Sequence, residues 1–133
     1  MCVTQPESAE EVSRALRILK DQQCIFAVKS GGHSACPGAS SVHGGVVIDL
    51  SRLKDIHVSD DETAVTVGTG NTWTNVYSVL EERRLLAVGG RAGSVGVGGF
   101  MLGGRLISIS CDSWPTSYRW NIISISSSWL GIG

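Results

Sequence analysis

An excess of charge of one sign and a long apolar run are both missing from this sequence. The 11 Lys and Arg residues stand against 12 Asp and Glu residues, which leaves a formal net charge of −1. Such a chain has no basic field for nucleic acid and no polybasic segment for a membrane surface. No apolar run is close to the length of a membrane-spanning helix, which needs about 18 residues. We therefore expect neither nucleic acid nor a membrane as a partner.

The cysteines lack the spacing of a metal site. The four of them form no C-x-x-C pair and match no zinc module, so we expect no metal. An even number would allow two disulfides whose pairing the sequence does not define, and buried free thiols are the simpler interpretation. The first residues also lack the basic, apolar and small-residue segments of a signal peptide, so the sequence does not indicate a cellular compartment. The cysteines are Cys2, Cys24, Cys36 and Cys111.

Glycine is the residue type in excess. The chain holds 17 glycines among 133 residues, about twice the usual share of roughly 7%. They gather at 31–45, 68–70 and 89–104, which favours loops of defined conformation over a flexible linker. Neither large cluster contains a G-x-G-x-x-G fingerprint or a G-x-x-x-x-G-K-[ST] P-loop, so the two common nucleotide motifs are excluded. The length is that of one domain.

Hydrophobic periodicity predicts two amphipathic helices. Ser8 to Glu11 form a capping box, and apolar residues then recur at i, i+3, i+4 and i+7, which predicts a helix over about 9–21. The same period from Trp73 to Leu80 predicts a second helix over about 72–83. Trp73 and Tyr77 on that stripe indicate core packing, with stacking on a flat cofactor as the alternative.

Short runs of β-branched residues predict the strands. A buried strand is expected at 25–28, a second strand at 45–50, and a hairpin from 56–58 and 63–67 across a polar turn. His57 alternates with apolar neighbours, so we expect it to face solvent. We see no strand before the first helix and do not expect that helix to join two parallel strands.

The segment 29–34 follows directly on an apolar run, and its composition predicts a ligand-binding loop. Tandem Gly31 and Gly32 allow positive φ and let a ligand approach bare amides, as a loop around a pyrophosphate requires. Ser30 and Ser34 add hydrogen-bond donors. His33 places a reactive nitrogen at the edge of the loop, where it could bond to a ligand or capture one covalently. The alternative is a surface turn whose histidine has no role in binding or catalysis.

The second glycine cluster, Gly89–Gly104, has eight glycines among 16 residues. Each glycine inside a helix costs about 1 kcal/mol relative to alanine, so we expect neither a helix nor a strand there. Close packing of backbone against backbone would explain the missing side chains. A flat cofactor would use the same space.

Four segments in this order resemble one family: Lys29-Ser30-Gly31-Gly32-His33-Ser34, the run Gly45–Leu50, the stretch from Val67 to Tyr77, and Gly89–Gly104. They are similar to the PCMH-type FAD-binding domain of FAD-linked oxidoreductases of the vanillyl-alcohol oxidase and berberine-bridge-enzyme type, which are common in fungi, including fungal secondary metabolism, and in plants. The resemblance covers residues 3–104. It implies an α+β fold of small mixed sheets with flanking helices, FAD as the cofactor, and oxidation of an alcohol, sugar or alkaloid-like substrate with electrons passed to oxygen.

The resemblance also implies site residues, with the first loop around the FAD pyrophosphate and the second cluster along the isoalloxazine and ribityl groups. His33 corresponds to a histidine that many relatives bond to the flavin 8α-methyl group. Lys29 stands where relatives often have arginine, so a phosphate contact there would come from a point charge. Ala92 matches the cysteine of a second attachment in some relatives, so we expect none here. The cofactor-binding residues implied are Ser30, Gly31, Gly32, His33, Ser34, Gly93, Ser94, Gly96, Gly98 and Gly99.

The resemblance ends at Gly104. Arg105 stands where the pattern would continue with glycine, and no period holds over a full element in 106–133. We expect residues 1–104 to be a partial FAD-binding domain and 105–133 to be a divergent tail of no recognised domain. Relatives carry a second flavin-binding half and a substrate domain beyond this point, and they are often secreted. A truncated, catalytically inactive flavin-binding fragment is therefore the alternative to an enzyme, and no catalytic residue can be assigned.

Overall fold

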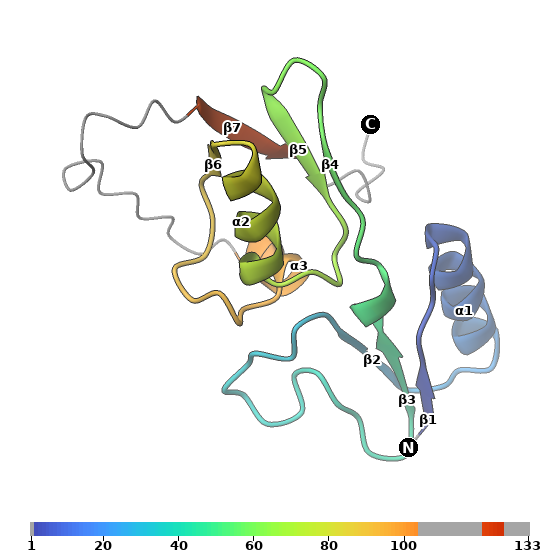
Figure 1. The fold of residues 1–133 in the computed structure, drawn as a ribbon. Coiled ribbons are helices and arrows are strands. Elements are labelled where there is room, and N and C mark those ends of the chain that lie inside the picture. Colours follow the sequence, from blue (N-terminus) through green and yellow to red (C-terminus); the bar gives the residue numbers. More distant parts are fainter. Residues whose placement is uncertain (1, 104–120, 127–133) are drawn as a thin grey trace.

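The computed structural model describes residues 2–103 and 121–126, which form two small sheets with helices beside them (Figure 1). The first sheet has the strand order β1 (Cys2–Thr4), β3 (Val46–Asp49), β2 (Phe26–Lys29), and both pairs are parallel. The second has the order β4 (Ile56–Val58), β5 (Ala64–Val67), β7 (Asn121–Ser126), β6 (Leu85–Ala87). The helices are α1 (Ala9–Asp21), the 3₁₀ turn η1 (Leu50–Arg52), α2 (Trp73–Glu82) and α3 (Val97–Leu102). The expected α+β class is confirmed.

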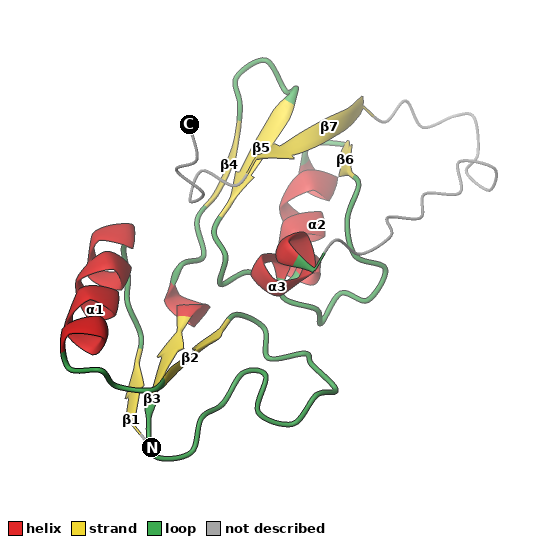
Figure 2. Cartoon of the chain, turned by 180° about the vertical axis from the view of Figure 1, so that it is seen from behind, coloured by secondary structure: helices red, strands yellow, loops and turns green. Residues whose placement is uncertain are grey.

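Helix α1 has the predicted ends, but its connection differs from the expectation. The Ser8 hydroxyl accepts from the Glu11 N–H at 3.2 Å, as the predicted capping box requires. The Glu11 carboxylate accepts from the Glu7 N–H at 2.8 Å, one residue before the N-cap N–H that the capping box would use. The helix leads from β1 to β2, and both strands lie parallel to β3 between them (Figure 2). The expectation that it joins no parallel strands is wrong, because a strand of only three residues shows no period.

Strand β2 lies within one residue of its predicted range but is not buried. Phe26 is 42% exposed and Val28 is 47% exposed, whereas Ile48 on the neighbouring β3 is fully buried. The reason is the strand order: β3 is central, and β2 lies at the edge of the sheet. Apolar composition predicts a strand but does not tell an edge strand from a central one.

The core lies between α2 and the second sheet. Trp73, Val76 and Leu80 on α2 are buried against β4, β5 and β6, so the interpretation of Trp73 as a core residue is confirmed. The predicted hairpin is also confirmed, since β4 and β5 pair antiparallel. His57 is exposed in β4, as expected.

The second glycine cluster does contain a helix, α3, so the expectation of no regular element there is wrong. Tertiary contacts offset the cost of its glycines. Val97 is buried and its N–H donates to the Asn71 carbonyl at 2.9 Å. Phe100 meets the Trp73 ring edge to face, with 5.1 Å between ring centroids. Helix propensity is a weak prior that such packing overrides.

Strand β7 comes from the part of the chain in which we saw no period. It pairs parallel with both β5 and β6. The rest of that part, 104–120 and 127–133, lies outside the described residues, and Arg105 and Cys111 lie there too. Cys2, Cys24 and Cys36 are exposed free thiols, so the interpretation as buried thiols is wrong for these three. No helix within residues 2–103 is long and apolar enough to cross a membrane.

Candidate functional site

A cavity of about 780 Å³ opens where the loop after β2 meets the second glycine cluster. It brings together seven of the ten predicted cofactor-binding residues, from segments more than 60 positions apart in the sequence. Of the other three, Gly98 lines a different hollow, and Gly93 and Ser94 line neither. The seven are Ser30, Gly31, Gly32, His33, Ser34, Gly96 and Gly99.

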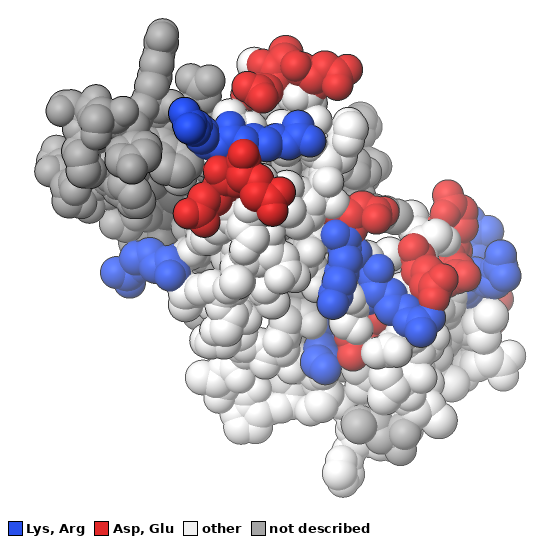
Figure 3. All heavy atoms as spheres, viewed as in Figure 1, with Lys and Arg blue, Asp and Glu red and all other residues white. Residues whose placement is uncertain are grey.

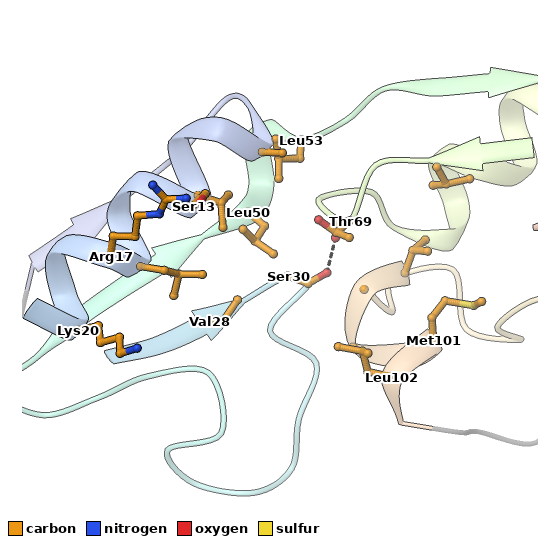
Figure 4. Close-up of a pocket in the computed structure, with 17 residues that line it drawn as sticks. Ser13, Arg17, Lys20, Val28, Ser30, Leu50, Leu53, Thr69, Met101 and Leu102 are labelled. Atoms are coloured by element: carbon orange, nitrogen blue, oxygen red, sulfur yellow. Dashed lines mark hydrogen bonds between the residues drawn. The ribbon is translucent and has the colours of Figure 1, made fainter. Parts of the chain in front are cut away.

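A hydrogen bond to the segment between β5 and α2 and a backbone contact at the start of α3 hold the loop in place. The Ser30 hydroxyl donates to the Thr69 carbonyl at 2.6 Å (Figure 4). Gly31 and Gly96 lie so close that a Cβ placed on Gly31 would be 2.6 Å from the Cα of Gly96. Backbone-on-backbone packing, the alternative to a ligand, therefore accounts for these two glycines.

The tip of the loop keeps free hydrogen-bond donors. Within the described residues, the N–H groups of Gly31, Gly32 and His33 donate to no protein acceptor. Gly32 has φ +67°, which alternates the direction of successive amides and favours glycine. Unpaired amides on a left-handed turn form a concave anion site. The loop therefore fits a phosphate group, and His33 is exposed on the same cavity.

Several glycines of the second cluster serve the core instead. A Cβ on Gly90 would lie 2.6 Å from the Trp73 ring, and Gly89 faces the same ring. Gly93 packs on the Thr74 side chain, and its carbonyl accepts from the Thr74 N–H at 2.9 Å. The structure gives Gly93 a packing role, whereas its predicted contact with a cofactor remains a prediction.

Lys29, at which the family resemblance would allow a phosphate contact, is paired with a carboxylate. Its ammonium lies 3.3 Å from the Asp49 carboxylate, and its side chain does not line the cavity. Burial alone would raise the pKa of Asp49, but hydrogen bonds from Ser51 and the charge and hydrogen bond of Lys29 outweigh it and hold the pKa below its ordinary value. Asp49 is therefore a carboxylate at neutral pH, and Lys29 is its partner.

Arg91 is a residue that sequence reasoning missed. It lines the cavity, is exposed, and forms no ion pair within the described residues. The signal was present, because Arg91 is the one Lys or Arg in the stretch 89–104. A guanidinium offers the bidentate geometry for a phosphate that a lysine lacks.

A second hollow, of about 580 Å³, lies between α1, β2 and α3 (Figure 4). Its walls are mostly apolar, from residues such as Val12, Leu16, Val28 and Leu102. Such walls do not fit a phosphate, whereas the cavity at the loop, with its free amides, does. On the face shown in Figure 3, acidic and basic side chains are interspersed.

Comparison with known proteins assigns the family. Residues 1–108 match the family described as FAD binding domain. The chain belongs to this FAD-binding family. Its cofactor is therefore FAD, and the free amides of the loop fit the pyrophosphate of that molecule. The match runs to residue 108, and the division of the chain at Gly104 into a domain and a tail stays a prediction.

Relatives of this FAD-binding chain are fungal flavoproteins. It is 52% identical over 103 residues to the FAD-dependent monooxygenase macF of Penicillium terrestre, covering 77% of this chain and 20% of that protein. It is 46% identical over 106 residues to the FAD-dependent monooxygenase yanF of Aspergillus niger, covering 79% of this chain and 18% of that protein. The chain thus spans about a fifth of the length of these relatives.

A solved flavoenzyme shows the same fold. Glucooligosaccharide oxidase from Acremonium strictum, which carries a 6-S-cysteinyl, 8α-N1-histidyl FAD, aligns with a TM-score of 0.66 and 27% identity. The alignment covers 76% of this chain and 22% of that one. The expected fold, part of a PCMH-type FAD-binding domain, is confirmed.

Gly99 gives a test of the cavity that leaves the core untouched. A Cβ at this position would meet no atom within 4 Å, so alanine fits the protein. We expect Gly99→Ala to leave the free energy of unfolding unchanged or to raise it by up to about 1 kcal/mol, because alanine has the higher helix propensity. We also expect it to weaken FAD binding, because the added methyl group occupies the cavity. Urea unfolding and FAD titration measure the two effects. Unchanged FAD affinity would place the cofactor away from Gly99.

Proposed function

We propose that this chain supplies the pyrophosphate-binding part of the flavin site in an FAD-dependent oxidoreductase, which oxidises an alcohol, sugar or alkaloid-like substrate and passes the electrons to oxygen. The observation that carries the proposal is the polar cavity, with free amides of Gly31, Gly32 and His33 on one wall. The relatives, which are FAD-dependent monooxygenases, support the redox class. Bound FAD supplies two-electron redox chemistry at its isoalloxazine ring.

The residues of this chain bind and orient the cofactor. The amides at the tip of the loop donate to phosphate oxygens, and Arg91, which lines the same cavity, adds a positive charge. Ser30 lines the cavity and fixes the loop through its bond to the Thr69 carbonyl. The amides and Arg91 would together set the position of the pyrophosphate and, through it, of the flavin ring.

His33 is the proposed site of covalent attachment. It is exposed on the cavity, so its imidazole can reach a ligand without rearrangement of the core. The 8α-histidyl FAD of glucooligosaccharide oxidase supports this role. Ala92 lines the same cavity and carries no thiol, which supports a single attachment through His33.

We expect His33→Ala to abolish flavin fluorescence that travels with the polypeptide on an acid-treated denaturing gel, while noncovalent FAD binding persists. The reason is that alanine removes the only nucleophilic nitrogen of the loop side chains 30–34. His43→Ala is the matched control, because His43 is exposed and does not line the cavity. Covalent flavin that survives in His33→Ala would refute the assignment.

A flavin-binding fragment without turnover is the second candidate, favoured by the fifth of the relatives' length that the chain spans. Anaerobic mixing of the FAD-loaded chain with panels of alcohols, sugars and alkaloids separates the two. Loss of flavin absorbance near 450 nm, restored by air, supports the oxidoreductase. Unchanged absorbance with every panel supports the binding fragment.

A further inference from the structure

Lys29 and Asp49 form a pair directly before the FAD loop. They are register partners at the ends of β2 and β3, and the Lys29 ammonium donates to the Asp49 carboxylate at 3.3 Å. The carboxylate is buried and also accepts from the Ser51 N–H at 3.0 Å. Two fixed hydrogen bonds hold Asp49 in place, and Asp49 in turn holds the end of the lysine side chain.

The stem of the same lysine lies against the loop. A Cβ placed on Gly32 would be 3.2 Å from the Cε of Lys29, so the methylene chain runs directly beside this glycine. Gly32 has φ +67° and lies between the two other residues with free amides, Gly31 and His33. Lys29 therefore forms the wall that the left-handed turn of the loop rests on.

We propose that Lys29 is a positioning residue for FAD. Asp49 fixes its ammonium, and its stem holds the turn at Gly32 in the conformation that presents the free amides to the pyrophosphate. The inference rests on the proposed function for the identity of the ligand. A loop that is ordered before binding avoids the entropic cost of being ordered by the ligand, and this raises affinity. Lys29 itself makes no contact with the phosphates.

A direct phosphate contact by Lys29 makes the opposite prediction for Asp49. If the lysine bound phosphate, Asp49→Asn would release its ammonium toward FAD and leave the affinity equal or higher. In the positioning role, Lys29→Met and Asp49→Asn each remove the same pair, so each lowers the affinity and the double variant is no worse than either one. Methionine retains much of the stem, and asparagine retains an acceptor for the Ser51 N–H.

The experiment measures the FAD affinity of the full chain by quenching of flavin fluorescence, for the two single variants, the double variant and Lys29→Arg. We expect each single variant and the double variant to bind FAD roughly tenfold more weakly, and Lys29→Arg to restore most of the affinity because arginine can still pair with Asp49. Lys54→Met and Asp60→Asn are matched controls on exposed residues without ion pairs in the described part of the chain.

The ¹⁵N order parameters of the backbone amides in 30–34, measured without FAD, give a second readout that does not depend on the cofactor. We expect lower order parameters in Lys29→Met and in Asp49→Asn but not in the two controls. Wild-type order parameters in these two variants, or Asp49→Asn that binds FAD at least as tightly as the wild type, would overturn the positioning role. If the wild-type chain binds no FAD while the two variants still show lower order parameters, the proposed function is refuted and the contact between Lys29 and the loop is supported.

Discussion

Replacing Gly96 with alanine is expected to abolish FAD binding and to lower the free energy of unfolding by about 1–3 kcal/mol, the usual cost of overpacking. The new Cβ would lie 2.7 Å from the Cα of Gly31 and 2.8 Å from the Ser30 hydroxyl oxygen. The Gly31 neighbour is backbone and cannot swing away, and the Ser30 hydroxyl is held by its hydrogen bond to the Thr69 carbonyl, so the loop and the start of α3 must separate. That separation changes the shape of the cavity that both segments line.

Gly99→Ala is the matched control for Gly96→Ala, because both are single methyl additions at the start of α3. Urea unfolding should separate them, with a loss of stability for Gly96→Ala and none for Gly99→Ala. FAD titration should show weaker binding in both. A Gly96→Ala chain with wild-type stability would contradict the close approach of Gly31 and Gly96, because the methyl group would then have room.

Replacing Trp73 with alanine should have the largest effect on stability. The side chain is fully buried, packs edge to face on Phe100, and lies against Tyr77, Gly89 and Gly90. Removing a buried aromatic ring of this kind costs about 3–5 kcal/mol, against a total of roughly 5–15 kcal/mol for an ordinary domain. The collapse of the ring's surroundings would also release the glycines that shape the cavity.

Trp73→Phe is the control for that prediction, because phenylalanine keeps an aromatic ring and loses only part of the volume. We expect it to lie between the wild type and Trp73→Ala in the midpoint of urea unfolding followed by far-UV circular dichroism. Equal midpoints for the wild type and Trp73→Ala would show that α2 does not pack on the second sheet as described.

Sequence patterns predicted the elements whose structure depends on residues close together in the sequence. The period of apolar residues and the cap at Ser8 were enough for α1, because helix formation depends on neighbours within four residues. A loop at 30–34 was likewise predictable, because tandem glycines favour irregular backbone, whereas its role in binding the cofactor remains a prediction. The structure adds that Gly31 and Gly96 are in contact, which no local pattern contains.

The features that were missed depend on contacts far apart in the sequence. The exposure of Phe26 depends on the position of β2 at the edge of the sheet. Helix α3 forms because Val97 and Phe100 reach the core. Composition alone does not tell a glycine that packs under an indole, such as Gly90, from one that faces an open cavity, such as Gly99. The pairing of Lys29 was not predicted for the same reason, since its partner Asp49 lies 20 residues away.

The most direct test of the FAD site is an equilibrium titration of the full chain with FAD, followed by flavin fluorescence and repeated in the presence of ADP. We predict one FAD per chain, competition by ADP for the phosphate-binding loop, and loss of binding in Gly96→Ala. A chain that is folded by circular dichroism, with Trp73 shielded from solvent, and that still binds no FAD would contradict the assignment of the cavity.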